Sequence, residues 1–152
     1  MGAEARLAEL GITVPEVVPP VAAYQPTART GNLVFTAGQL PARDGEMLAV
    51  GKLGGEVDAE QGYACARQCA LNALAAVKAE ICSLDDVKRV VKVVVFVAST
   101  PDFTAQPQVA NGASQLFVDV FGEAGQHVRS AVGVPVLPLD APVEVELVAE
   151  PA

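Results

Sequence analysis

The segment VKRVVKVVVFVA (87–98) is the strongest predicted β-strand of the chain. Every odd-numbered position from 91 to 97 is a valine, so one face of this strand is wholly apolar. The opposite face carries Lys92 and then Val94 and Phe96, so its second half is apolar as well. Burial on both faces is typical of a strand inside a sheet. We therefore expect residues 87–98 to form a central strand.

Two amphipathic segments flank this strand and are predicted to be helices. The first begins near Asp58, an N-cap residue followed three positions later by Gln61, as in a capping box. The second begins after residues 100–102 and has Pro107 in its first turn. Each helix has one apolar face suited to packing on a sheet. These faces contain Ala66, Ala70, Ala73, Leu74, Val77 and Ile81 in the first helix, and Val109, Ala113, Leu116, Phe117 and Val120 in the second.

Four further strands and a short helix complete the expected order. Residues 33–39 form a strand entered by a turn at Gly31-Asn32, and residues 46–50 are expected to pair back onto it. Residues 128–136 and 143–149 are the last two strands, and residues 3–10 form a short helix. The order β-β-α-β-α-β-β predicts an α+β sandwich, a mixed sheet with both helices on one face. We expect a single domain over 1–152, with 1–16 as an N-terminal extension.

The last two strands are expected to form a hairpin with one polar face. If their valine-rich faces lie together in the core, the other face holds Arg129, Ala131 and Gly133 beside Glu144 and Glu146. Small neighbours would leave open space around the arginine, as in a pocket floor. The alternative is a solvated sheet face with weak ion pairs.

Arg129 and Glu144 would nevertheless lie far apart in such a hairpin. A turn near residue 139 or 140 leaves them about six residues apart along the ladder, which is roughly 20 Å. The two side chains could share one small site only if a second subunit supplied one of them.

The composition excludes several classes of function. The formal net charge is −8, and the ten Lys and Arg residues form no basic stripe, which argues against nucleic acid as a partner. The three cysteines lack the spacing of a zinc site, so no metal and no cofactor are expected. No stretch is apolar enough to be a signal peptide or a membrane span, so we expect a cytoplasmic protein without a membrane partner.

Three segments carry a resemblance to a known family: RTGNLVFTAGQLP (29–41), VVKVVVFVAS (90–99), and VRSAVGVPVLP followed by VEVELVA within 128–149. Together they resemble the RidA/YjgF/UK114 family, in the same order along the chain. The resemblance implies a chorismate-mutase-like fold and a homotrimer with sites at the subunit interfaces. It also implies hydrolysis of enamines and imines, such as 2-aminoacrylate, to 2-keto acids and ammonia.

The resemblance also assigns roles to individual residues. Arg129 matches the arginine that clamps the substrate carboxylate, a task for which a planar guanidinium is suited. Glu144 matches the acid that orients the attacking water. Tyr24 matches the tyrosine that closes the pocket, and Gly38 matches the turn that approaches the ligand through its backbone. Asn111 matches a family asparagine that contacts substrate.

The chain departs from the family pattern around this pocket. Ala131, expected to contact substrate, stands where well-studied members often carry Cys, and Ala37 stands where many have Ser. His127-Val128 precedes Arg129 in place of Pro-Ala. The chain is therefore similar to a divergent branch. His127 is interpreted either as a proton donor or ligand contact, or as a surface or turn histidine.

Three functions are consistent with these residues. The first is an enamine or imine deaminase, a hydrolase acting on C=N bonds. The second is a non-catalytic trimer that binds a small carboxylate-bearing metabolite. The third, an endoribonuclease as described for some relatives, conflicts with the acidic composition. The first two require Arg129, and the first alone requires a water-orienting acid.

Overall fold

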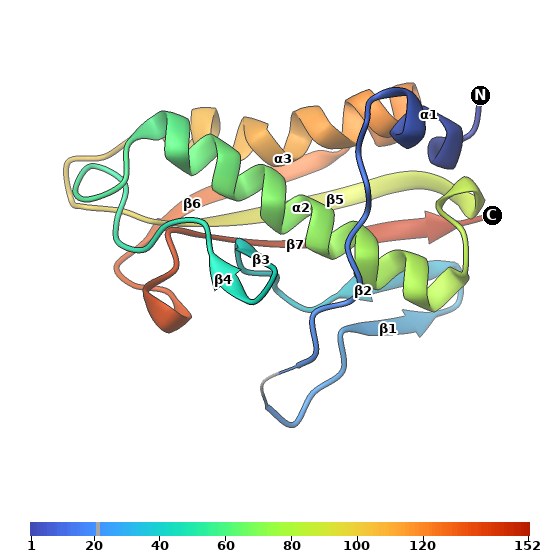
Figure 1. Cartoon of the computed structure of the whole chain (residues 1–152), viewed down its shortest axis with the longest axis horizontal. Coiled ribbons are helices and arrows are strands. Elements are labelled where there is room, and N and C mark those ends of the chain that lie inside the picture. Colours follow the sequence, from blue (N-terminus) through green and yellow to red (C-terminus); the bar gives the residue numbers. More distant parts are fainter. Residues whose placement is uncertain (21) are drawn as a thin grey trace.

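The protein is built on a five-stranded sheet with the strand order β1-β2-β7-β5-β6 (Figure 1). The computed structural model describes residues 1–20 and 22–152. The strands are β1 (Thr27–Thr30), β2 (Leu33–Thr36), β5 (Val87–Ala98), β6 (Val128–Val134) and β7 (Val143–Pro151). The long strand β5 lies between β7 and β6, which confirms its prediction as an interior strand.

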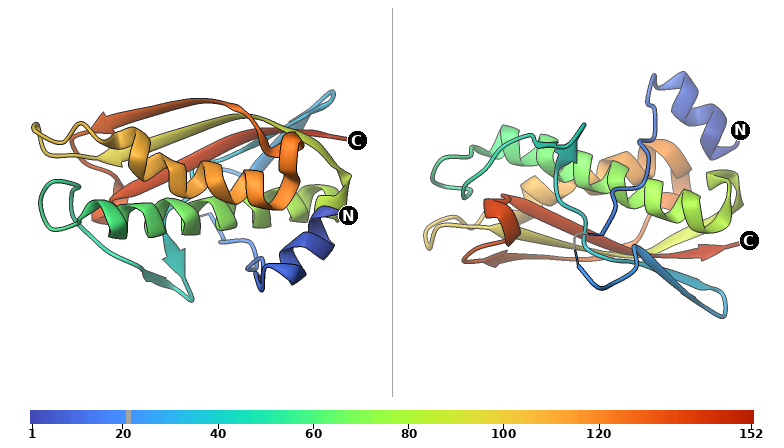
Figure 2. Two further views of the ribbon diagram at one scale, coloured as in Figure 1. Left: turned by 90° about the horizontal axis from the view of Figure 1, so that it is seen from above. Right: turned by 60° about the horizontal axis from the view of Figure 1, so that its bottom comes forward.

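Two helices cover one face of this sheet. Helices α2 (Ala59–Ile81) and α3 (Gln106–Phe121) run side by side over it, as both views in Figure 2 show. The predicted capping box of Asp58 and Gln61 begins α2. The two helices approach closely at Gly112, where a Cβ atom would collide with the backbone carbonyl of Tyr63. The predicted apolar faces of both helices form the core, and the predicted α+β sandwich with both helices on one face of a mixed sheet is confirmed.

The early strands differ from the expected pairing. Residues 33–36 pair with β1, a strand that the sequence pattern did not indicate. The segment after the turn at 44–45 does not return to this strand. Instead β4 (Glu46–Met47) pairs with β3 (Ala42–Arg43) in a small separate hairpin. The two segments are adjacent in sequence, and the shortest turn joins them.

The predicted hairpin of the last two strands is wrong. Strand β6 pairs in parallel with β5, and β7 pairs antiparallel with β5 and with β2, so that β5 separates β6 from β7. The physical reason is the apolar length of β5, which requires a neighbour along each edge. The helix α3 makes the crossover that a parallel β5-β6 pair needs.

This topology also reverses the predicted faces of β6. Arg129 and Ala131 pair with Val93 and Val95, whose side chains are buried under the helices, so both face the helical layer. Val128 and Val132 lie on the opposite, open face, where they are 65% and 44% exposed. Ser130, which is exposed, shares that open face. The valine-rich side of β6 is therefore apolar without being buried in the chain.

A β-bulge changes one detail of β5. The pairing with β7 shifts between Val90 and Lys92, so Val90 joins the core while Val91 is half-buried. The expected apolar face is correct from Val93 onward. A bulge inserts one residue and so reverses the alternation on one side of it.

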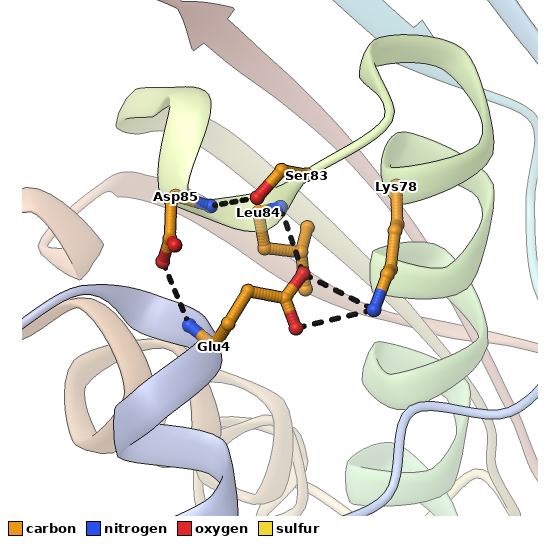
Figure 3. Close-up of polar contacts among 5 residues, drawn as sticks. All are labelled: Glu4, Lys78, Ser83, Leu84 and Asp85. Atoms are coloured by element: carbon orange, nitrogen blue, oxygen red, sulfur yellow. Dashed lines mark hydrogen bonds and ion pairs between the residues drawn. The ribbon is translucent and has the colours of Figure 1, made fainter.

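The short helix α1 (Ala3–Glu9) is joined by reciprocal capping to η1 (Leu84–Asp86), the short 3-10 helix that follows α2 (Figure 3). The Glu4 amide donates to Asp85 Oδ1 at 2.9 Å, and the Leu84 amide donates to Glu4 Oε1 at 3.1 Å. Lys78 Nζ lies 3.1 Å from the same Glu4 carboxylate. Leu7 is buried against the core. No helix in the described residues is long and apolar enough to cross a membrane.

Candidate functional site

Arg129 lies on β6, the edge strand, with its guanidinium directed toward α3. Its Nη1 donates hydrogen bonds to Asn111 Oδ1 at 2.8 Å and to Ser114 Oγ at 3.1 Å. Asn111 and Ser114 are three residues apart and therefore lie on the same side of α3. The structure thus brings together Arg129 and Asn111, two of the residues that the resemblance selected.

His127 extends this group, which we call the arginine cluster: Asn111, Ser114, His127 and Arg129. Its Nε2 lies 2.8 Å from Ser114 Oγ, and its Nδ1 lies 2.7 Å from the Gly125 carbonyl oxygen. Burial lowers the pKa of His127, as does the charge of Arg129, while the Gly125 carbonyl opposes them. The imidazole is half-buried in the short segment between α3 and β6, and both of its ring nitrogens contact groups of the chain.

Glu144 lies in a notch formed by Gly38, on the other side of the sheet. A Cβ atom on Gly38 would collide with the Glu144 carboxylate. The backbones are held in register because Gln39 and Val145 exchange amide–carbonyl hydrogen bonds of 2.8 and 3.0 Å. Gly38 is therefore required because the Glu144 carboxylate packs against its backbone. Gly38 also lines an apolar cavity, whereas Glu144 is not one of the described residues that line it.

Burial raises the pKa of Glu144, and the neighbouring Glu146 raises it further. Both carboxylates lie on the open face of β7, opposite Phe96 and Val94 of β5. A carboxyl group with a raised pKa is a better proton carrier near neutral pH than an ordinary glutamate.

An apolar cavity of about 440 Å³ opens beside Gly38. Tyr24, Leu40 and Met47 line it together with Leu139. Tyr24 is 46% exposed, so its ring stands at the surface of the cavity. Leu139 and Asp140 both have positive φ angles, 59° and 57°, in the turn that connects β6 to β7. We call Tyr24, Gly38, Glu144 and this cavity the glutamate cluster.

The structure does not place Arg129 and Glu144 on one face, contrary to the sequence-based expectation. Arg129 faces the helices, whereas Glu144 faces away from them, and β5 lies between their strands. The expected pocket floor is also absent from the described part of β6. Ala131 packs against the core, and the space at Gly133 is occupied by the Gln106 side chain.

A buried polar pair on α2 supports the glutamate cluster. Asn72 Nδ2 donates to the carbonyls of Leu40 and Ala42, both at 2.9 Å. Gln68 Nε2 donates to Asn72 Oδ1 at 3.1 Å. These bonds hold the chain that leads from Gly38 to β3, and with it one wall of the cavity.

Sequence reasoning missed Ser114 and Asn72. Ser114 lies one helical turn after Asn111, and that spacing was a usable signal. Asn72 gave a weaker signal, a polar residue within an otherwise small and apolar helix face. Nothing in the local sequence indicates that its partners are carbonyls 30 and 32 residues away.

The other reactive groups do not form a metal site. Among residues 1–20 and 22–152, no group of three or more His, Cys, Asp or Glu side chains could hold a metal ion. Cys65 and Cys69 are buried and Cys82 is exposed, and all three are free thiols. Burial raises the pKa of the Cys65 thiol to about 11, which makes it a poor nucleophile.

The mixed sheet with two helices on one face, and a polar cluster on each side of it, defines a small protein of the chorismate-mutase-like class. A family model described as "YjgF/chorismate mutase-like, putative endoribonuclease" matches residues 4–151. The chain belongs to this family.

Individual relatives agree with this assignment. Protein TCP17 of Trypanosoma cruzi is 45% identical over 147 residues, covering 96% of this chain and 92% of that protein. Atu1372 of Agrobacterium tumefaciens, of unknown function, is 42% identical with a TM-score of 0.90, covering 98% and 91% of the two chains. A Shewanella oneidensis protein given the same endoribonuclease description is 33% identical with a TM-score of 0.95, covering 99% of each chain.

One more distant structure contains a ligand. Escherichia coli TdcF, solved with bound serine, is 28% identical to this chain with a TM-score of 0.62. The match covers 91% of this chain and 94% of TdcF.

Proposed function

We propose that this protein binds a small carboxylate-bearing metabolite between the subunits of a homotrimer and hydrolyses enamines or imines such as 2-aminoacrylate. The observation that carries the proposal is the separation of two complementary clusters on one chain. The arginine cluster offers a guanidinium for a carboxylate, and the glutamate cluster offers a proton acceptor beside an apolar cavity. Each cluster supplies what the other lacks.

The open face of the sheet supports an assembly of several copies. Apolar side chains gather there, including Phe35 (41% exposed) beside Val148, and Val132 at the β6 edge. An apolar sheet face that no helix of the chain covers in the described residues is typical of a subunit interface. A closed trimer would bring Glu144 of one subunit toward Arg129 of the next.

The chemistry demands little of the protein. An imine carbon is already electrophilic, so the site has to hold the substrate, supply a water and move a proton. Glu144, as a carboxylate, accepts a proton from the attacking water as the new C–O bond forms and returns it to the imine nitrogen, which gives a carbinolamine. In a second transfer Glu144 takes the hydroxyl proton as the carbonyl forms and delivers it to the amine nitrogen as the C–N bond breaks, so that a keto acid and ammonia leave.

The cavity and the relatives support this substrate class. The apolar lining suits the side chain of a 2-imino acid, while the carboxylate end requires Arg129. Serine, bound in TdcF, is likewise a small carboxylate-bearing molecule. The net charge of −8 disfavours the endoribonuclease function that the family description names, because RNA binding requires basic surface.

The test is an assay with 2-aminoacrylate generated in situ. Keto-acid release should be faster with the wild-type protein than without it, and Arg129→Ala should abolish the acceleration. Glu144→Gln should retain binding of pyruvate, the keto-acid product, while turnover falls at least 100-fold. Release at the background rate in the presence of intact trimer refutes the deaminase.

The second candidate is a non-catalytic carboxylate-binding trimer. It is favoured by Ala37 and Ala131, which offer no polar side chain where relatives often carry Ser and Cys. In that case Arg129→Ala abolishes pyruvate binding, and neither the wild type nor Glu144→Gln accelerates keto-acid release.

A further inference from the structure

We propose that Ser114 and His127 are positioning residues that orient Arg129 and reserve one edge of its guanidinium for the ligand carboxylate. The inference rests on the proposed role of Arg129 in binding. Ser114 and His127 lie beside the arginine and act on the ligand only through it. The direction of each hydrogen bond in the arginine cluster follows from elementary donor and acceptor rules.

The first bond fixes the tautomer of His127. A carbonyl oxygen can only accept, so the 2.7 Å contact with Gly125 requires a hydrogen on Nδ1. Burial and the nearby Arg129 charge favour neutral imidazole, as the lowered pKa of His127 indicates. Nε2 then carries a lone pair, and the Ser114 hydroxyl must donate to it over 2.8 Å.

The second bond fixes the role of Ser114 toward Arg129. A hydroxyl has one hydrogen, and Ser114 uses it to donate a hydrogen bond to His127. Toward Arg129 the Ser114 oxygen can therefore only accept. Arg129 Nη1 donates to it at 3.1 Å and uses its other hydrogen for Asn111 Oδ1 at 2.8 Å. Both hydrogens of Nη1 are therefore occupied.

The edge of the Arg129 guanidinium that carries Nε–H and Nη2–H remains free for a ligand. No protein acceptor contacts these groups within the described residues. Two parallel N–H groups on one guanidinium edge match the two oxygens of a carboxylate. The cluster thus turns a flexible side chain into a preorganised fork, which lowers the entropy lost on binding.

Packing holds His127 in place at the end of the hydrogen-bond series that runs from Arg129 through Ser114. The His127 ring meets the buried Phe117 ring edge to face, with centroids 5.8 Å apart and an interplanar angle of 86°. At Gly125 a Cβ atom would collide with the Phe117 carbonyl, so glycine is required for its own carbonyl to reach His127. The histidine anchor is therefore built into the turn after α3.

The first measurement is the ¹⁵N NMR spectrum of His127, which is the single histidine of the chain and needs no assignment. At neutral pH the neutral ring should be in the Nδ1–H form, opposite to the Nε2–H form that a free histidine side chain prefers in water. An Nε2–H tautomer, or a charged ring at pH 7.5, overturns the inference.

The second measurement is calorimetric binding of pyruvate and of its methyl ester, which lacks the carboxylate charge. Ser114→Ala and His127→Phe should weaken pyruvate binding about tenfold, the loss of one charge-assisted hydrogen bond. Ester binding should change little. Ser114→Thr keeps the hydroxyl and should retain affinity for pyruvate.

The outcomes separate this inference from the proposed function. If Arg129→Ala abolishes pyruvate binding while Ser114→Ala leaves it unchanged, Arg129 binds the ligand and the positioning role is refuted. If Ser114→Ala weakens the binding of pyruvate and of the ester equally, the substitution disturbs the fold as a whole, and the positioning role is again refuted. If the wild-type trimer binds no pyruvate, both ideas fail together.

Discussion

Gly38 is the residue at which a single added carbon atom should displace Glu144, the acid that we propose to be catalytic. In Gly38→Ala the added Cβ would occupy the place of the Glu144 carboxylate and displace it. We expect imine turnover to fall at least tenfold, since small misplacements of reacting groups are costly. The measurement is kcat with 2-aminoacrylate. The matched control is Gly55→Ala, where a Cβ has ordinary contacts, and equal losses in both variants would contradict the explanation.

Glu144 should also leave a signature in the pH dependence of stability. Its pKa is raised in the folded state above the ordinary 4.5, so the folded state holds this proton more tightly than the unfolded state. The resulting stabilisation is present below the ordinary pKa and is lost as pH rises through the raised value. The Glu144→Gln variant has no carboxylate to ionise, so it should not lose this stability as the pH rises.

Urea unfolding of the wild type and Glu144→Gln between pH 3.5 and 7.5 measures the effect. The variant should be more stable than the wild type at pH 7.5, by less than about 1 kcal/mol because the group is half solvated. The gap should close toward pH 3.5. A variant that is less stable at neutral pH would show that the carboxylate is favourably paired instead.

At the scale of elements, the buried amides of α2 should stabilise the wall of the cavity. Asn72→Ala removes two donors to backbone carbonyls and leaves Gln68 without its partner. We expect a loss of about 3 kcal/mol in the free energy of unfolding. Pyruvate affinity should fall with it, because the Leu40–Ala42 wall loosens. Gln108→Ala, an exposed amide on α3, should change neither quantity.

The local signals in the sequence predicted the elements well. The capping box at Asp58 begins α2 as expected, and the limits of β5 agree with the structure because its valine-rich pattern is long. Pairing was harder to predict. Strands β6 and β7 are neighbours in sequence with prolines between them, which favours a hairpin, but the two edges of β5 compete for both strands.

Some residues of the candidate site were predictable from the sequence, but their contacts across the fold were not. Arg129 and Asn111 were selected by resemblance and lie in contact, whereas their hydrogen bond joins residues 18 apart on different elements. The predicted face of Arg129 is wrong because valine-rich alternation in a strand does not by itself mean burial within one chain. On β6 it marks the open face instead, where Val128 and Val132 remain exposed.

At the scale of the whole molecule, the open face should hold the copies of the chain together. Val132→Lys places a charge on that face without entering the core of the subunit. The wild type should elute as a trimer in size exclusion with light scattering, and the variant should shift toward monomer while its circular dichroism stays folded. A monomeric wild type would contradict the assembly.

The proposed division of the site between two subunits can be tested by mixing two inactive variants. Arg129→Ala keeps Glu144, and Glu144→Gln keeps Arg129, so neither homotrimer contains a complete site. After co-refolding at equal amounts, random assembly gives each interface the two intact residues in about one case in four. Keto-acid release should therefore recover to about a quarter of the wild-type rate. Native mass spectrometry of differently tagged chains verifies that mixed trimers have formed. If these mixed trimers stay inactive, the working site either takes both residues from one subunit or does not contain them.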